Sequence, residues 1–153
     1  MIKQRIIYNG SYFSRKPNGI SVVSRELAKS INPNLMTLLA PFSDNQSNFH
    51  KIPENLSPDN GLYSHARRLF WNQFHLGNYL KKESDSILFS PLPEAPIFRG
   101  IKSVVLVHDL LPLRIPYLTP LLPYHICYVP LVLKNASKIL CNSLATANEV
   151  HEK

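Results

Sequence analysis

Apolar residues follow two alternating patterns along the chain. Short, nearly continuous apolar runs are typical of strands buried on both faces of a parallel sheet. Five such runs predict strands: RIIYN (5–9), NLMTLLA (34–40), SILFS (86–90), SVVLVH (103–108) and KILCNS (138–143). Between them, apolar residues recur at helical spacing, which predicts helices at 19–31, 63–82 and 123–137 and a last helix capped by Ser143.

Strands that alternate with helices predict an α/β fold: a single domain with a doubly wound parallel sheet of at least five strands. With 153 residues the chain is long enough to bury the core of one such domain. Residues 41–62 are polar and interrupted by prolines, so we expect a long surface loop there. Pro130 predicts a kink in the third helix, or its division into two shorter helices.

The predicted helix at 63–82 has apolar residues along one side, which predict its buried face: Ala66, Leu69, Phe70, Phe74 and Leu80. It also has basic residues and a tryptophan: Arg67, Arg68, Trp71, Lys81 and Lys82. Two interpretations stay open. Either the aromatic residues belong to the core and the charges to a solvated face, or the basic and aromatic residues together attach the protein to an anionic membrane.

The formal net charge of +7 is concentrated in the first part of the chain. Through Lys82 there are eleven Lys or Arg residues against four acids, and beyond it there are six against six. A basic face is typical of contact with nucleic acid, an anionic membrane or a phosphorylated substrate. No helix-turn-helix, zinc-finger or RNA-binding signature is present, so we expect no nucleic-acid partner.

The cellular compartment is predicted from three features that the sequence lacks: a membrane span, a secretory signal and paired cysteines. No apolar run approaches the ~20 residues that span a bilayer, and the start, MIKQRIIYNG, lacks the apolar region of a secretory signal. Cys127 and Cys141 have neither metal-ligand nor redox spacing, and we interpret both as buried, reduced thiols. The sequence therefore predicts a cytoplasmic protein.

Polar side chains follow several of the predicted strands. Asn9 ends the first, Ser90 the third, His108 and Asp109 the fourth, and Ser143 the fifth. In a parallel α/β sheet, ligands bind in the crevice outside the carboxyl ends of the strands. Strand ends are also polar simply because loops begin there, but several ends together predict a cleft, with His108 and Asp109 lining it.

The first helix starts at Asn18-Gly19, directly after the loop that follows the first strand. A helix N-terminus offers unpaired N–H groups and the positive end of the helix dipole, and glycine lets a phosphate approach the backbone closely. The segment is neither a G-x-G-x-x-G nor a P-loop sequence. A simple turn at Pro17-Asn18-Gly19 is the other interpretation.

The motifs "PNGIS", "SREL", "VVLVHDLLPLRIP" and "ASKILCNS", in this order, resemble the N-terminal domain of retaining glycosyltransferases of the group-one (family four) type. The resemblance covers most of the chain, except 41–62. Members of this family have the GT-B fold, in which two Rossmann-like domains face each other across a cleft. The resemblance implies that residues 1–153 form a Rossmann-like, acceptor-side domain. It also implies a nucleotide-sugar donor, a glycan or lipid-linked acceptor and no metal cofactor.

The resemblance also implies residue roles. Asn18 and Gly19 would lie near the donor diphosphate, although the family often has two adjacent glycines at this turn. His108 would lie beside the transferred sugar as the catalytic residue, Asp109 would fix its loop, and Ser143 would face the same cleft. Because acceptors in this family are often lipid-linked, the resemblance also fits a peripheral position on the inner face of the membrane.

The family's second domain carries a pair of glutamates eight positions apart, and no two glutamates of this chain have that separation. We therefore expect a C-terminal nucleotide-binding domain as partner, and no sugar transfer by residues 1–153 alone. The competing hypothesis is a non-catalytic Rossmann-like subunit that docks a partner chain. A metal phosphohydrolase is disfavoured because the other histidines form no ligand set with His108 and Asp109, and a serine hydrolase because no G-x-S-x-G motif is present.

Overall fold

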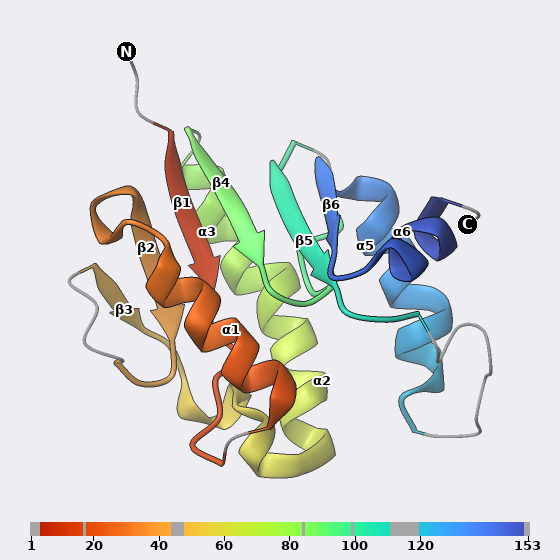
Figure 1. Cartoon of the computed structure of the whole chain (residues 1–153). Helices are drawn as coiled ribbons and strands as arrows, with labels where there is room; N and C mark the ends of the chain where they lie inside the picture. The colour runs from red at the N-terminus through yellow and green to blue at the C-terminus, as the bar shows by residue number, and fades with distance from the viewer. Residues whose placement is uncertain are drawn as a thin grey trace.

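The protein is an α/β domain built on a six-stranded, entirely parallel sheet, as the sequence predicts (Figure 1). A computed structural model describes residues 4–16, 18–43, 48–83, 85–98, 100–110 and 120–151. The strands are β1 (Arg5–Asn9), β2 (Met36–Ala40), β3 (Phe49–Lys51), β4 (Ser86–Ser90), β5 (Ser103–Val107) and β6 (Lys138–Cys141). All five predicted strands are present, and β3 is an additional one.

The strand order is β3-β2-β1-β4-β5-β6, the order of the Rossmann fold. Ile7 of β1 lies opposite Thr37 of β2 and Leu88 of β4, so β1 and β4 are neighbours at the centre of the sheet. The chain winds in one direction from β1 to β3 and in the other from β4 to β6. The connections that leave β1 and β4 therefore diverge, and a crevice at the carboxyl ends of these two strands follows from the topology.

Helices cover both faces of the sheet (Figure 1). Helix α1 (Gly19–Ser30) crosses the front face. Behind the sheet, α2 (Gly61–Trp71), a π-helical turn (Asn72–Leu76) and α3 (Gly77–Lys82) form one continuous helical rod. A second π-helical turn (Tyr124–Tyr128) leads into α5 (Val129–Asn135), and α6 is Leu144–His151. Short 3-10 turns span Pro33–Leu35, Glu54–Leu56 and Pro58–Asn60.

Two larger apolar clusters hold the layers together, one on each face of the sheet, and a smaller third cluster joins Val107 of β5 to Val129 of α5. Successive strand residues point to opposite faces, so Ile7 packs with Leu76 and Leu80 behind the sheet, while Tyr8 packs with Ala28 of α1 in front. The buried Tyr8 hydroxyl donates a hydrogen bond to the Ser24 carbonyl of α1, 2.6 Å away. Burial of each such large side chain contributes about 1.5–3 kcal/mol to folding.

Within the segment 41–62, the described residues 41–43 and 48–62 do not form the long surface loop that the polarity of the segment predicted. It contains β3, which pairs with β2, and two 3-10 turns. Ile52 and Leu56 are buried and belong to the core cluster behind the sheet. The few apolar residues of this polar segment are enough to anchor it, because they reach an apolar cluster built by distant strands.

The buried face of the helical rod differs from the predicted one. Ala66, Phe70 and Phe74 are exposed, and the buried positions are Ser64, Arg68, Asn72, Leu76, Gly77 and Leu80. The first half of the rod turns polar side chains inward because it lies over a buried carboxylate, that of Glu94. The prediction from apolar periodicity was correct only for Leu69, which is half-buried, and Leu80.

Pro130 lies in the first turn of α5, just after the π-helical turn, where its missing N–H costs little. The backbone stays helical from the π-helical turn into α5, so the predicted division into two separate helices is absent here, and the change of hydrogen-bond pattern lies directly before Pro130. Cys127 is exposed and Cys141 is half-buried, so the prediction of two buried thiols was wrong. The proline-rich continuation of the fourth strand (111–119) and Pro17 lie outside the described residues.

Candidate functional site

The carboxyl ends of the central strands border a pocket of about 260 Å³. Its polar lining comes from the β1–α1 loop, α2, the segment after β4, the end of β5 and the helical turn before α5: Tyr12, His65, Arg68, Glu94, His108, Asp109, Tyr124 and His125. Its apolar lining is Ile20, Leu92, Pro93, Leu110, Leu121 and Val129. A concave, largely apolar lining with a few convergent polar groups is the usual form of a small-molecule site.

His108 follows β5 and lies in the pocket wall, where the sequence predicted a cleft. Its Nε2 is 2.9 Å from the Pro91 carbonyl oxygen. Because a carbonyl only accepts, Nε2 must carry the proton and donate it, which leaves Nδ1 of the neutral ring as an acceptor. Within the described part of the chain, Nδ1 has no hydrogen-bond partner. His108 therefore offers the pocket an acceptor, on a ring whose orientation the Pro91 carbonyl fixes.

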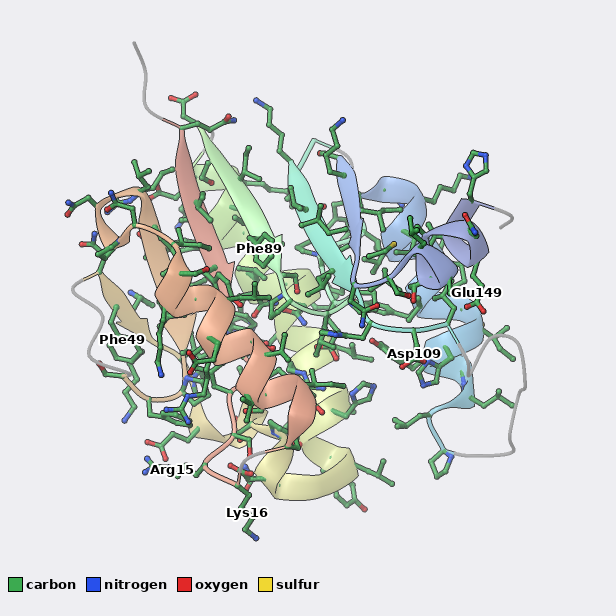
Figure 2. All side chains as sticks on the ribbon, in the orientation of Figure 1. Arg15, Lys16, Phe49, Phe89, Asp109 and Glu149 are labelled. Atoms are coloured by element: carbon green, nitrogen blue, oxygen red, sulfur yellow. The ribbon has the colours of Figure 1, made fainter. Side chains whose placement is uncertain are left out.

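Asp109 is exposed and lies on the connection that leaves β5, beside α5 (Figure 2). Its carboxylate is close enough to His125 to affect that ring. Burial lowers the pKa of His125 below its usual value, and the negative charge of Asp109 opposes this shift in part. Asp109 thus brings a carboxylate to the rim of the pocket.

The floor of the pocket is a buried ion pair. Arg68 Nε donates to Glu94 Oε2 at 2.6 Å, and Arg68 Nη2 donates to Glu94 Oε1 at 2.9 Å. Both side chains are almost fully buried, at 2% and 3% exposure. Burial works to lower the pKa of Arg68, but the charge and hydrogen bonds of Glu94 outweigh it and raise that pKa above its usual value. The two charges cancel, so the floor offers no net positive charge to a phosphate.

His65, one turn before Arg68 on α2, is hydrogen-bonded to the arginine. Arg68 Nη2 lies 2.9 Å from His65 Nδ1, and a guanidinium only donates, so Nδ1 accepts and the proton is on Nε2. This Nε2–H is buried and has no partner among the described residues. An unsatisfied buried donor of this kind costs about 1–3 kcal/mol.

Tyr12 and Tyr124 give the pocket aromatic walls. The ring of Tyr124 meets His65 edge-on at 4.6 Å, and the Arg68 guanidinium lies over the Tyr12 ring at 4.9 Å. Burial raises the pKa of both tyrosines, that of Tyr124 strongly, so both keep their hydroxyl protons at neutral pH. They can donate to a ligand oxygen while their ring faces pack against apolar C–H groups.

Asn9 and Ser90, predicted to line the cleft, lie buried beneath it instead, at 2% and 1% exposure. Asn9 Nδ2 donates to Asn72 Oδ1 at 3.0 Å and to the Glu94 carbonyl at 3.3 Å, and the Ser90 hydroxyl donates to the same carbonyl at 2.9 Å. Their role is to fix the segment that carries Glu94. Neither residue is among those that line the pocket.

Asn18 and Gly19 begin α1 at the mouth of the pocket, where Ile20 belongs to the lining. Asn18 Oδ1 accepts a hydrogen bond from the Ser21 N–H at 2.9 Å, so the asparagine itself caps the helix. Open space surrounds Gly19, where an added Cβ would meet no atom within 4 Å. The contact of these two residues with a donor diphosphate stays a prediction.

Ser143 caps α6, as predicted, because its Oγ accepts a hydrogen bond from the Thr146 N–H at 3.1 Å. It does not line the pocket. Its link to the site is indirect: the Thr146 hydroxyl donates to the His108 carbonyl at 3.3 Å, so the start of α6 supports the backbone of His108.

The predicted membrane-facing residues do not share one surface. Arg68 is buried in the ion pair with Glu94, so its assignment to a membrane-facing surface was wrong. Trp71 is half-buried and packs against the core cluster behind the sheet. Arg67, Lys81 and Lys82 are exposed.

Sequence reasoning missed five of the eight polar lining residues: Tyr12, His65, Glu94, Tyr124 and His125. None of them belongs to a motif, and each reaches the pocket from an element whose position only the tertiary fold defines. A signal for Arg68 and Glu94 existed in principle, since a helix with no acid of its own needs a distant carboxylate for any arginine that it buries.

Among the described residues, no three His, Cys, Asp or Glu side chains are grouped so that they could hold a metal ion. No helix in the described ranges is both long and apolar enough to cross a membrane.

Comparisons of this chain with protein-family models, with curated proteins and with solved structures give no match.

Proposed function

We propose that residues 1–153 form the acceptor-side, N-terminal domain of a retaining glycosyltransferase with the GT-B fold. The enzyme would move a sugar from a nucleotide-sugar donor to a glycan or lipid-linked acceptor, in the cytoplasm and at the inner face of the membrane. The observation that carries the proposal is the pocket at the diverging carboxyl ends of β1 and β4, with the motif residues His108 and Asp109 in its wall.

The chemistry of the pocket supports a sugar as its ligand. A sugar hydroxyl both donates and accepts hydrogen bonds, and the pocket offers an acceptor at His108 Nδ1 and donors at the protonated hydroxyls of Tyr12 and Tyr124. A pyranose ring also has apolar C–H faces, which suit the rings of Tyr12 and Tyr124. Because Arg68 is neutralised by Glu94, the pocket suits a neutral ligand better than a phosphate.

The donor diphosphate would instead lie outside this pocket, at the start of α1. There the negative charge of the diphosphate would be stabilised by the positive end of the helix dipole and by the backbone N–H groups of Gly19 and its neighbours. Retaining transfer passes through an oxocarbenium-like transition state, and groups from several sides must stabilise the developing charge. One wall of a cleft does not provide this, so the proposal includes a second, nucleotide-binding domain that closes over the first.

The test is a transfer assay with a panel of nucleotide-sugar donors, on residues 1–153 alone and on the same residues combined with a candidate nucleotide-binding second domain. We expect no transfer by the isolated domain, and transfer with retained anomeric configuration by the two-domain protein. Turnover by residues 1–153 alone would overturn the two-domain account. Binding of a partner chain without transfer from any donor would favour the non-catalytic subunit instead.

A further inference from the structure

In the first half of the helical rod formed by α2, the π-helical turn and α3 (Gly61–Lys82), polar side chains face the core and aromatic side chains face outward. Its buried face carries the polar side chains of Ser64, Arg68 and Asn72, each at most 2% exposed. Its outer face carries aromatic side chains, with Phe70 58% and Phe74 50% exposed. A helix that serves only the core places its residues the other way round.

The outward aromatic residues form a contiguous cluster rather than isolated contacts. The ring centroids of Phe70 and Phe74 are 4.5 Å apart, and Phe98, 40% exposed, meets Phe74 at 6.5 Å. Tyr63, 82% exposed, precedes Phe70 by two helical turns on the same side of the rod. We call Tyr63, Phe70, Phe74 and Phe98 the aromatic surface. A grouped, exposed apolar surface of this kind marks an interaction site more often than single exposed residues do.

The charge of the rod has one sign. Residues 61–82 include four Lys or Arg and no Asp or Glu. Arg68 is neutralised by Glu94, whereas Arg67, Lys81 and Lys82 are exposed and make no ion pair with another described side chain. The ammonium of Lys81 lies 5.3 Å from the centre of the Phe98 ring, so charge and aromatic surface are in direct contact.

We propose that the aromatic surface, with Arg67, Lys81 and Lys82 around it, binds the surface of a bilayer that contains anionic lipid. The rod, about 33 Å long at 1.5 Å per residue, would lie in the plane of the membrane. The phenylalanine rings would enter the boundary between headgroups and acyl chains, and the three cations would contact lipid phosphates. This inference does not depend on sugar transfer, because it rests on the outer face of the rod alone.

The contacts favour a lipid surface over an acidic protein. Apart from Phe98, the aromatic and basic residues of this surface all lie along one helical rod, as in helices that lie in the plane of a bilayer. The same rod contributes His65 and Arg68 to the pocket from its inner side. Attachment by the outer side would therefore hold the mouth of the pocket close to the bilayer.

The experiment is flotation of residues 1–153 with vesicles of equal parts phosphatidylcholine and phosphatidylglycerol, and with vesicles of phosphatidylcholine alone. We expect binding to the anionic vesicles at low salt, weakened by high salt. Phe70→Ser with Phe74→Ser should lower the partition coefficient at least tenfold. The charge reversal Arg67→Glu, Lys81→Glu and Lys82→Glu should lower it on the order of 100-fold.

The matched control is Arg25→Glu and Lys29→Glu on α1, across the sheet from the rod, together with Lys138→Glu on the edge strand β6, an equal change of charge. Circular dichroism melting checks that each variant folds. The proposal requires the control to bind within a few-fold of the unaltered protein. It is overturned if the unaltered protein does not float at low salt, if the control loses binding as fully as the rod variant, or if the phenylalanine variant binds as well as the unaltered protein.

Discussion

Arg68 and Glu94, 26 positions apart in sequence, form a doubly hydrogen-bonded ion pair beneath the pocket. The pair joins α2 to the segment after β4. Asn72 adds a 3.4 Å contact to the same carboxylate, and the Leu56 carbonyl accepts from Arg68 Nη1 at 3.1 Å. Every nitrogen of the guanidinium thus has a hydrogen-bond partner, and these bonds offset the free-energy cost of burying the charge.

Removal of the arginine should leave Glu94 as an uncompensated buried charge. We expect Arg68→Met to lower the free energy of unfolding by about 3–5 kcal/mol, as when one partner of a buried ion pair is lost. The neighbouring Arg67 is exposed, and Arg67→Met should change stability by no more than about 0.5 kcal/mol. Urea unfolding of the two variants makes the comparison, and equal costs would show that Arg68 and Glu94 are not paired in the core.

Two glycines at either end of the β1–α1 loop should respond in opposite ways to alanine. At Gly10 an added Cβ would lie 2.9 Å from the Ala40 Cβ and from the Leu39 carbonyl oxygen, too close for a real contact. Gly10→Ala should cost about 1–3 kcal/mol through overpacking. At Gly19 the space is open, so Gly19→Ala should be neutral or stabilise by up to about 1 kcal/mol.

Thermal melts of Gly10→Ala and Gly19→Ala measure the difference directly. A melting temperature for Gly10→Ala equal to that of the unaltered protein would mean that β1 and β2 do not approach as closely as described. If Gly19→Ala keeps the melting temperature but weakens binding of a nucleotide-sugar, that result would support the predicted diphosphate contact at the start of α1.

His65 should make stability fall in mildly acidic solution. Burial, the positive charge of Arg68 and the proximity of His125 lower the pKa of His65, and the charge of Glu94 opposes them only in part. The unfolded chain therefore binds this proton at a higher pH than the folded protein does. Stability should decrease as the pH falls from about 6.5, the ordinary histidine value, toward the lowered pKa.

Urea unfolding at a series of pH values between neutral and mildly acidic tests this prediction. His65→Gln, which cannot be protonated, should flatten the dependence. The exposed His75 provides the control, since His75→Gln should leave the dependence as it is. Stability that rises on acidification, or a His65→Gln variant with an unchanged profile, would contradict the assignment of His65 as a buried neutral ring.

The strands and their order of appearance could be predicted because each is a short apolar run with its own local signal. The site could be predicted only where it coincides with a strand end. His108 follows β5 directly, so parallel topology alone brings it to the crevice. Asn9 and Ser90 share this topology but lie beneath the surface, because the segment that carries Glu94 folds over them. No local sequence pattern shows that this segment covers Asn9 and Ser90.

For the helical rod, the apolar periodicity of the sequence predicted the wrong buried face. Apolar side chains were assigned to the core, as in most helices, and this placed Phe70 and Phe74 inside. The core under the first half of the rod is instead a polar network around Glu94, so the rod turns Arg68 and Asn72 inward. The inward position of these polar side chains depends on the carboxylate of Glu94, which lies in the segment after β4, far from the rod in sequence.

The most direct test of the account is the kcat/KM for sugar transfer by the two-domain enzyme with His108→Ala. Loss of one oriented hydrogen bond near the developing charge should lower kcat/KM by about 10²-fold, with the melting temperature preserved. His50→Ala, an exposed histidine on β3 and away from the pocket, should keep full activity. Unchanged kcat/KM in a folded His108→Ala enzyme would contradict the assignment of this pocket to sugar transfer.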